Sequence, residues 1–343
     1  MRRMIRSLLI AGILVAAAAA ASAAWWFNAS LDAPLELPDS GYKLEVRRGS
    51  SLTSVATELA AAGVLTQPRV LSWHGRLTGE AGRVQAGEYR LEPGVTARSL
   101  LQQLVSGQVV LHTLTILEGW TVRELLVALA EHQAIEQTLS VESPEELAQA
   151  LGLEMSHAEG WFFPDTYRFP RGTKDTEVLM LAHELMRERL ADAWAMRAPD
   201  TNLADPYAAL ILASIVERES ALDSERPQVA GVFTRRLERG MRLQTDPTVI
   251  YGLGTDFDGN LTRRHLTTDT PYNTYTRKGL PPTPIALPGE GALHAAVNPD
   301  DSSTLYFVAT GRDDGSHVFT ETLEEHNAAV AQYLAELRRR KNN

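Results

Sequence analysis

One stretch near the N-terminus restricts the fold more than any other feature of the chain. No charged residue occurs from Ser7 to Leu31, and the twenty residues 8–27 are all apolar or small. As a helix they would extend about 30 Å, which matches the hydrocarbon thickness of a bilayer. An Ala-rich helix buried in a soluble core is the alternative, but it fits poorly with the basic residues that precede the stretch, so we predict a membrane helix at 8–27.

The flanks of this stretch predict its orientation. Residues 1–7 contain Arg2, Arg3 and Arg6 and no acid, and Trp25-Trp26-Phe27 close the run. Basic residues favour the cytoplasmic side and aromatic residues favour the interface, so we expect a cytoplasmic N-terminus and an uncleaved single-pass anchor in the cell (inner) membrane. A cleaved signal peptide is the alternative, because Ala21-Ser22-Ala23 is a suitable cleavage site. Either way the rest of the chain is extracytoplasmic, or periplasmic, and residues 28–40, with two prolines, are predicted as a linker.

Composition excludes several classes of protein. The 343 residues predict about two domains. The absence of cysteine excludes disulfide scaffolds, thiolate metal sites and cysteine nucleophiles. Without the bases of residues 1–7 and 338–341, the chain carries 26 Lys and Arg against 43 Asp and Glu, so nucleic acid is not an expected partner.

A weak repeat follows the linker. Residues 44–59, 89–104 and 114–129 each read as a short strand, a turn glycine, a hydroxyl residue two positions later and a helix with one apolar face. The hydroxyl residues Ser51, Thr96 and Thr121 are the predicted N-caps, and Glu124 completes a capping box with Thr121. We predict a small α+β module over 41–135 with a binding or spacer role, and a larger α+β domain over 140–343.

Two motifs in the larger domain do not by themselves identify a function. Residues 159–167, Glu-Gly-Trp-Phe-Phe-Pro-Asp-Thr-Tyr, form either a loop that buries its aromatic side chains in a core or a wall on which sugars stack. A long amphipathic helix is expected over 175–197. Its His183-Glu184 begins like a zinc-protease helix, but Arg187 stands where the second histidine belongs, so no metal or cofactor is predicted.

The segment 207–220 carries the main chemical prediction. It is apolar nearly all round through Val216, which predicts a buried helix, and it ends with Glu217 and Glu219. Glu219 continues the apolar stripe of the helix, so burial should raise its pKa, as a general acid near neutral pH requires. The alternative is that the helix reaches solvent here and both acids pair with nearby arginines.

Downstream loops favour a neutral, polar substrate. Residues 241–252 place polar groups in a turn, residues 270–276 are rich in hydroxyl and amide groups, and residues 279–289 are stiffened by proline. A charge-poor polar cleft beside one buried acid suits a carbohydrate. The predicted substrate-binding residues are Glu217, Gln244, Asp246, Tyr272, Asn273 and Tyr275.

These motifs resemble a known family. Ala-Ser-Ile-Val-Glu-Arg-Glu-Ser (213–220), Met-Arg-Leu-Gln-Thr-Asp-Pro-Thr-Val-Ile-Tyr-Gly (241–252), Tyr-Asn-Thr-Tyr-Thr (272–276) and Gly-Leu-Pro-Pro-Thr-Pro-Ile-Ala-Leu-Pro-Gly (279–289) resemble the endolytic murein transglycosylases, the MltG or YceG-like family. The motif 159–167, the strand 305–309 and His317-Val318-Phe319 match too. The resemblance covers essentially the whole chain.

The resemblance implies a membrane-anchored enzyme with a LysM-like module at 41–135 and a catalytic transglycosylase domain. Such enzymes cut peptidoglycan glycan strands internally between N-acetylmuramic acid and N-acetylglucosamine and leave a 1,6-anhydro end. The family's catalytic glutamate corresponds to Glu219. Glycan strands, the membrane and penicillin-binding protein synthases are the implied partners.

Three other functions stay open. A muramidase-type hydrolase would leave reducing ends, and a non-catalytic wall-binding anchor would not need Glu219. A lyase acting on aminodeoxychorismate is disfavoured because the domain is expected outside the cytoplasm and has no cofactor-lysine motif. At the C-terminus we predict strands 305–309 and 317–320 and a helix 323–340, whose basic end complements the helix dipole.

Overall fold

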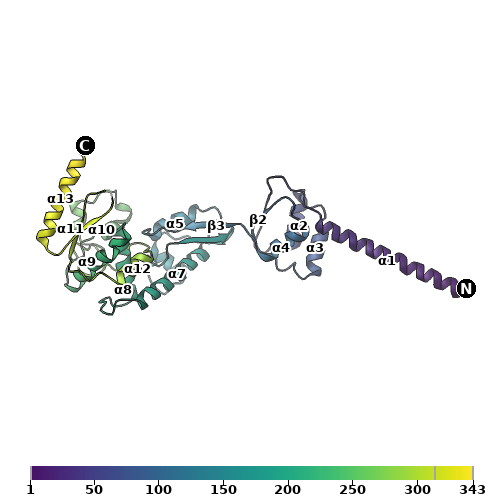
Figure 1. Cartoon of the computed structure of the whole chain (residues 1–343), viewed down its shortest axis with the longest axis horizontal. Coiled ribbons are helices and arrows are strands. Elements are labelled where there is room, and N and C mark those ends of the chain that lie inside the picture. Colours follow the sequence, from purple (N-terminus) through teal and green to yellow (C-terminus); the bar gives the residue numbers. More distant parts are fainter. Residues whose placement is uncertain (1, 313, 342–343) are drawn as a thin grey trace. The chain divides into compact units, whose positions relative to one another are not determined.

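The computed structural model describes residues 2–312 and 314–341; Met1, Asp313, Asn342 and Asn343 lie outside the described residues, although the predicted segments 1–7 and 140–343 include them. The chain forms two compact units. Unit 1 comprises Met1–His112 and Arg168–Thr173, and unit 2 comprises Thr113–Tyr167 and Lys174–Asn343. Both helices and strands occur throughout the chain, as the predicted α+β class requires (Figure 1).

Helix α1 (Arg2–Asp32) contains the predicted segment 8–27. From Met4 to Asp32 it is long and apolar enough to cross a membrane, by length and composition, and its most apolar part is exposed. A signal sequence near the N-terminus would meet the same criteria.

Part of the segment predicted as a linker is packed against unit 1, through the buried Leu31 and Leu35. Helix α1 continues to Asp32, and Leu31 in its last turn is completely buried in the core of the unit. Beyond it, the Leu35 N–H donates to the Val95 carbonyl over 2.8 Å, and the Glu36 N–H donates to that of Val64 over 3.0 Å. Residues 31–36 therefore differ from the expected linker because their apolar side chains and backbone groups find partners within the unit.

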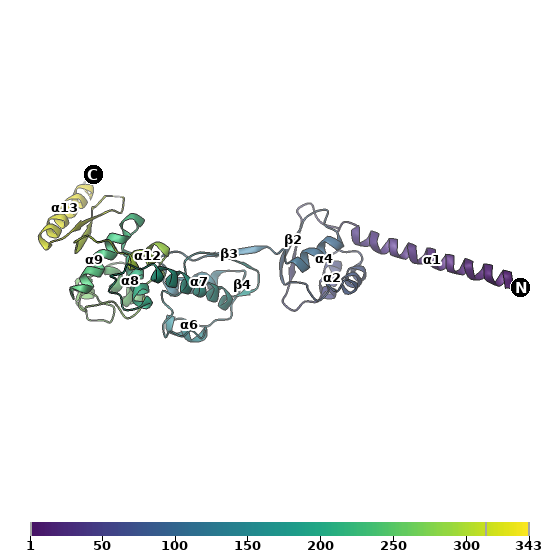
Figure 2. The same ribbon diagram turned by 60° about the horizontal axis from the view of Figure 1, so that its bottom comes forward.

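Unit 1 is built around one antiparallel strand pair, in which β1 (Tyr42–Val46) pairs with β2 (Gly87–Leu91) and Leu44 lies opposite Tyr89. Helices α2 (Leu52–Ala61), α3 (Pro68–Leu77) and α4 (Ala97–Ser106) pack with it (Figure 2). The completely buried Tyr89 donates its hydroxyl hydrogen to the Gln85 carbonyl over 2.8 Å, so the largest core side chain has its polar group satisfied.

The three predicted strand-turn-helix copies are confirmed. The third consists of β3 (Leu111–Thr115) and α5 (Val122–Glu131). Ser51, Thr96 and Thr121 are the N-caps of the three helices, and the capping box of Thr121 with Glu124 is formed. The first two copies belong to unit 1, whereas the helix of the third belongs to unit 2.

Residues 111–195, most of which belong to unit 2, contain short strands and two further helices. Strand β3 pairs with β5 (Thr166–Pro170), and β4 (Ile135–Glu136) pairs with β6 (Thr173–Lys174). Helix α6 (Pro144–Ala150) follows β4, and α7 (Asp175–Ala195) confirms the predicted long helix. In the loop 159–167, Phe162 and Phe163 are buried, and Trp161 stacks on Tyr207 with ring centroids 6.0 Å apart, so these aromatic side chains belong to the core.

Helix α8 (Pro206–Glu219) lies at the centre of the unit 2 core and contacts α7, α9 (Arg226–Glu238), α10 (Asp246–Leu253) and α12 (Glu290–Val297). Residues 209–216 of α8 are all buried, as predicted from their apolar character. Short helical turns connect these elements: η1 (Asp223–Glu225), η2 (Gly254–Asp256) and α11 (Arg263–Thr267).

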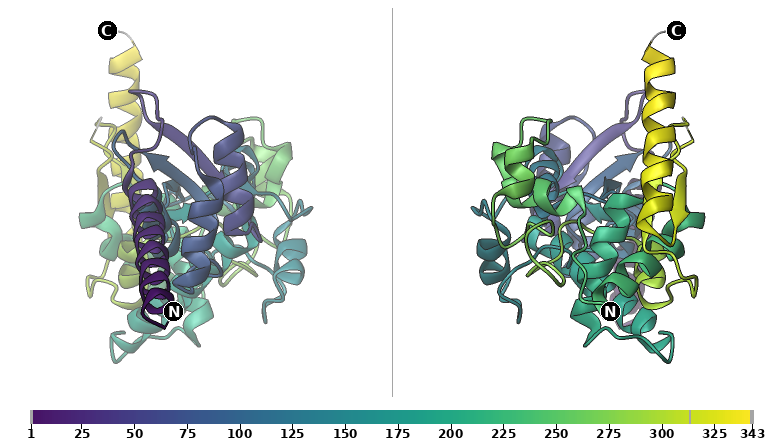
Figure 3. Two further views of the ribbon diagram at one scale, coloured as in Figure 1. Left: turned by 90° about the vertical axis from the view of Figure 1, so that its right-hand side faces the viewer. Right: turned by 90° about the vertical axis from the view of Figure 1, so that its left-hand side faces the viewer.

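The C-terminal part of unit 2 is an antiparallel strand pair with a helix against it. Strands β7 (Tyr306–Ala309) and β8 (His317–Thr320) pair with Phe307 opposite Phe319, and α13 (Leu323–Lys341) packs against both strands (Figure 3). The predicted elements of this region are confirmed. This arrangement brings the last part of the sequence to the end of the central helix.

Candidate active site

Helix α8 positions the predicted catalytic acid. Asp205 caps the helix by accepting a hydrogen bond from the Ala208 N–H over 2.8 Å, and Pro206 occupies the first turn, where it costs no hydrogen bond. Glu219 is the last residue of the helix. Residues 209–216 of the helix are buried, so the core of unit 2 supports the helix end that carries the carboxyl group.

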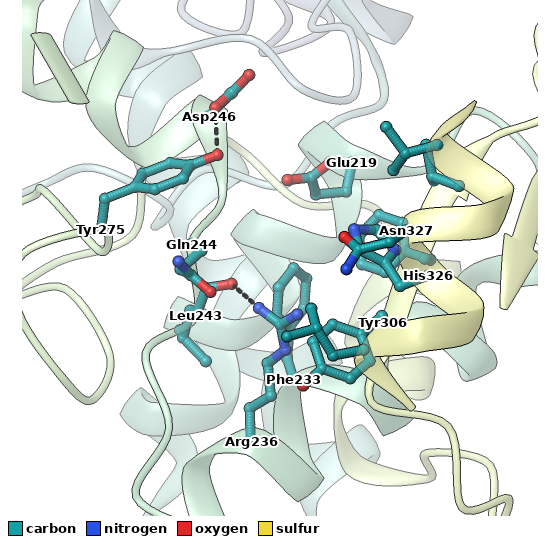
Figure 4. Close-up of a pocket in the computed structure, with 14 residues that line it drawn as sticks. Glu219, Phe233, Arg236, Leu243, Gln244, Asp246, Tyr275, Tyr306, His326 and Asn327 are labelled. Atoms are coloured by element: carbon teal, nitrogen blue, oxygen red, sulfur yellow. Dashed lines mark hydrogen bonds between the residues drawn. The ribbon is translucent and has the colours of Figure 1, made fainter. Parts of the chain in front are cut away.

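A cavity of about 570 Å³ opens at this end of α8 (Figure 4). Its lining comes from four parts of unit 2: α8, α9, the segment 243–275 and the C-terminal elements β7 and α13. The residues that line it are Glu219, Phe233, Arg236, Leu243, Gln244, Asp246, Tyr275, Tyr306, Phe307, Val308, Leu323, His326, Asn327 and Val330. Four of the predicted site residues are among them, namely Glu219, Gln244, Asp246 and Tyr275.

Glu219 is a weakened acid. Burial raises its pKa above the usual range for a glutamate, and the nearby negative charge of Asp246 raises it further. The Thr245 hydroxyl donates a hydrogen bond to its Oε1, and together with the positive charge of Arg236 this opposes the rise. The carboxyl group of Glu219 therefore binds its proton more tightly than that of a solvent-exposed glutamate. When Glu219 is ionised, the Thr245 hydroxyl stabilises its carboxylate by a hydrogen bond.

The turn before α10 supplies three consecutive groups to the site. Gln244 has φ +54°, and it is the one residue other than glycine with a left-handed backbone among those that the structure describes. Strain of this kind persists where neighbouring contacts enforce it, and it is concentrated at functional sites. Two residues later, Asp246 accepts a hydrogen bond from the Tyr275 hydroxyl over 2.6 Å. Thr245 between them reaches Glu219, so one turn places three polar side chains around the acid.

The opposite wall of the cavity was not predicted from the sequence. It consists of residues from β7 and α13, and His326 and Asn327 face the cavity in Figure 4. His326 stacks on Tyr306 with ring centroids 5.2 Å apart, and the guanidinium of Arg236 covers the same tyrosine at 5.1 Å. Burial lowers the pKa of His326, so its imidazole is neutral at neutral pH. The sequence signal for this wall is the strand 305–309, which matches the family but contains no acid or base that would predict a role in catalysis.

Glu217 does not line the cavity, although it was predicted in the substrate-binding set. Its side chain is 5% exposed and accepts hydrogen bonds from Arg226 Nη2 and the Gly289 N–H, both over 2.9 Å. These bonds tie the end of α8 to the starts of α9 and α12. The structure thus places Glu217 behind the site, as a brace for the helix end.

Two other predicted residues also lie outside the lining. Asn273 is completely buried, and its side-chain amide donates to the carbonyls of His265, Leu266 and Thr268, which fixes the loop that carries Tyr275. The Tyr272 hydroxyl shares a hydrogen bond of 2.7 Å with Thr283, and its ring meets Tyr251 edge-on at 5.0 Å. Both residues hold the loops of the site in place, and neither forms part of the cavity surface.

A second buried acid lies elsewhere in unit 2. Glu159 is 1% exposed, and burial raises its pKa to about 8. It accepts hydrogen bonds from the Val122 N–H at the start of α5 and from the Tyr251 hydroxyl of α10. Its partners are structural elements, so it connects α5 to α10.

The side chains of the site do not form a set of metal ligands. Within residues 2–312 and 314–341, no three His, Asp or Glu side chains gather in a way that could hold a metal ion. What the arrangement can do chemically is transfer a proton: Glu219 can give one to a bound oxygen atom and take one back, with Thr245 stabilising its carboxylate in between.

An acid of raised pKa in an open polar cavity, with a second carboxyl group on the facing turn, is an arrangement suited to general acid–base chemistry. The sequence model of the YceG-like family matches residues 44–332, and the chain belongs to this family.

Proteins of known name and structure support the family assignment. A Bacillus subtilis (strain 168) protein named endolytic murein transglycosylase is 30% identical over 327 residues, which cover 90% of this chain and 89% of the relative. A Streptococcus pneumoniae (strain D39) protein of the same name is 28% identical, and the match covers 84% of this chain but 58% of that longer relative. The crystal structure of a YceG-like protein from Listeria monocytogenes superposes with a TM-score of 0.53 at 28% identity, covering 84% of this chain and 99% of that one.

Proposed function

We propose that this protein is a membrane-anchored endolytic lytic transglycosylase of peptidoglycan. It would cleave the bond between N-acetylmuramic acid and N-acetylglucosamine within nascent glycan strands, leave a 1,6-anhydro-N-acetylmuramic acid end and so terminate strand elongation. The observation that carries the proposal is Glu219, a carboxyl group of raised pKa at a cavity of about 570 Å³, in a chain whose relatives bear the name of this activity.

The reaction needs one proton donor that later becomes a proton acceptor. Glu219 donates its proton to the glycosidic oxygen as the bond from that oxygen to C1 of the muramyl residue breaks. The C6 hydroxyl of the same sugar then attacks C1 and forms the 1,6-anhydro bond, and its proton returns to the Glu219 carboxylate. The attack is intramolecular, so proximity accelerates it and no water is consumed. Between the two steps, Thr245 and Arg236 stabilise the carboxylate.

We assign the contacts with sugar to the residues that line the cavity. Gln244, Asp246 and Tyr275 present amide, carboxylate and phenol groups beside Glu219, which are the hydrogen-bonding partners that sugar hydroxyl and acetamido groups require. Glu217, Tyr272 and Asn273 act in our proposal by holding the loops and the helix end in place.

The membrane location is part of the proposal. Helix α1 would span the cell membrane once, with the N-terminus in the cytoplasm, and the following residues would face the wall. This location would bring the enzyme to the place where new strands emerge, next to the penicillin-binding protein synthases that we propose as partners.

Asp246 gives specific support to a second candidate, a muramidase-type hydrolase. Ordinary glycosidases use two carboxyl groups, one as acid and one as nucleophile or base, and this cavity contains two. In our proposal Asp246 instead raises the pKa of Glu219 and stabilises positive charge at C1. The two mechanisms differ in whether solvent oxygen enters the product.

Digestion of purified glycan strands by the reconstituted full-length chain tests both candidates. We expect products that are one water lighter than hydrolysis products and that contain no ¹⁸O when the reaction runs in ¹⁸O-water. Reducing ends with ¹⁸O would refute transglycosylation. Glu219→Gln should lower cleavage by at least about 100-fold, the usual contribution of general acid catalysis. Glu184→Gln, in an exposed ion pair of α7, is the matched control and should leave cleavage unchanged. An unchanged cleavage rate for Glu219→Gln would refute Glu219 as the acid, and absence of cleavage by the unsubstituted chain would support a non-catalytic wall anchor.

A further inference from the structure

Helix α3 of unit 1 has an exposed face that is both basic and apolar. Trp73 is 59% exposed and Leu77 is 79% exposed, and Arg69 and Arg76 are exposed on the same side of the helix. The spacing of these four residues places them on one helical face. The other face, with Val70, Leu71, Ser72 and Gly75, is buried against the rest of the unit. No acid occurs between Pro68 and Leu77.

The position of α3 along helix α1 can be read from one contact. His74, in the middle of α3, lies with its ring centroid 6.3 Å from that of Phe27. Phe27 is the last residue of the apolar segment 8–27, directly after the exposed Trp25 and Trp26. If that segment fills the hydrocarbon layer, α3 lies at the level where the layer ends.

The distance left for water between unit 1 and the membrane is very small. Leu31 is four residues beyond Phe27, about 6 Å along the helix, and it is already completely buried in the core of unit 1. The headgroup layer on one side of a bilayer is itself about 5–8 Å thick. The side of unit 1 next to α1 therefore has to lie among headgroups, and α3 is on that side (Figure 1).

Side-chain contacts attach the last turns of α1 to unit 1. Arg98 of α4 donates from Nε to Asp32 Oδ1 over 2.7 Å and from Nη2 to Asn28 Oδ1 over 3.0 Å. Together with buried Leu31, these bonds fix the last turns of the helix from two sides. A flexible linker would let unit 1 swing away from the surface, whereas these contacts favour one position of unit 1, and so of α3, relative to the end of α1.

We propose that α3 is a second membrane contact, which binds anionic lipid headgroups on the extracytoplasmic side of the bilayer. Trp73 and Leu77 insert between headgroups, and Arg69 and Arg76 pair with lipid phosphates. A cavity of about 420 Å³ between α2 and α3, lined by both arginines and by Thr53 and Thr57, offers donors to a phosphate group. The proposal rests on the proposed membrane anchoring of α1.

The chain is suited to a test by site-directed labelling because it contains no cysteine. Full-length protein with Leu77→Cys, carrying an environment-sensitive fluorophore, is reconstituted into nanodiscs of phosphatidylglycerol or of phosphatidylcholine. Leu111→Cys is the matched control, since Leu111 of β3 is also an exposed leucine of unit 1, at 53%. Both side chains are exposed, so neither substitution removes core packing.

We expect the label at position 77 to shift to shorter wavelength and to be quenched by spin-labelled lipid, more strongly with phosphatidylglycerol, and the label at 111 to do neither. Arg69→Glu with Arg76→Glu should abolish the preference for the anionic lipid, because each arginine near an anionic surface contributes roughly fivefold to binding. Co-migration of the protein with the nanodiscs tests the anchor separately. If the protein co-migrates and the label at 77 stays in water, the proposal is overturned. If glycan strands, but not lipid, protect that label, the face is a glycan site instead.

Discussion

The hydrogen bond from Thr245 to Glu219 allows a prediction whose sign and size both follow from the site. Thr245→Val removes this bond while keeping the shape of a side chain that is 2% exposed. The backbone contacts of the residue, including its N–H bond to Thr274 Oγ1 over 3.1 Å, are retained. A hydrogen bond to a charged group contributes about 1.5–3 kcal/mol. Its loss here destabilises the ionised form of Glu219 relative to the protonated form by this amount. The ionisation constant of Glu219 should therefore fall about 10- to 100-fold.

The assay is the pH dependence of kcat/KM on purified glycan strands. A general acid must start protonated, so activity declines as pH rises through its pKa, and a higher pKa moves this decline to higher pH. Asp246→Asn should move it in the opposite direction, because removal of a neighbouring negative charge lowers the pKa of Glu219. Opposite movements in the two variants, each with unchanged thermal unfolding, would identify Glu219 as the titrating acid. If kcat/KM declines at the same pH in both variants as in the unsubstituted protein, this reasoning is refuted.

Three further predictions concern two residues near Glu219 and Thr245 and the second buried acid, Glu159. Glu217→Gln should lower the free energy of unfolding in urea by about 3 kcal/mol, since it leaves the buried Arg226 without its closest anion. Gln244→Gly should change that free energy by less than about 1 kcal/mol, because relief of the left-handed strain offsets the entropy of glycine, while kcat/KM falls if the amide contacts sugar. Glu159 binds its proton more tightly when folded, so unfolding free energy should fall as pH rises from about 4.5 to about 8. In Glu159→Gln that slope should flatten, and an equal slope in both proteins would assign it to other groups.

Local sequence signals predicted much of the fold. A hydroxyl residue two positions after a turn glycine specifies where a helix begins, and all three such N-caps formed as predicted. An unbroken apolar run specifies burial, and α8 is buried over 209–216. These signals work because caps and apolar faces depend on residues a few positions apart.

Long-range packing could not be predicted in the same way. The β7–α13 wall meets the end of α8 although His326 is more than a hundred positions from Glu219. Residues 28–40 contain two prolines and suggested a linker, yet Leu31 has its partners in the core of unit 1. Thr245 had no signal of its own, since a threonine in a turn is ordinary until the fold brings a carboxyl group within hydrogen-bonding distance.

The separation of Glu217 from Glu219 shows how one helix end can provide both a brace and an acid. Successive residues of an α-helix are rotated by 100°, so side chains two positions apart point about 200° away from each other and cannot enter the same cavity. Both carboxyl groups lose hydration at the end of a buried helix. Burial raises the pKa of Glu217, but the Gly289 N–H and Arg226 oppose the rise by stabilising its ionised form. Burial also raises the pKa of Glu219, where Thr245 opposes the rise and the negative charge of Asp246 adds to it, which favours the protonated form that a general acid needs. The brace in turn supports the acid, because Glu217 ties α8 to α9 and α12 within one turn of Glu219.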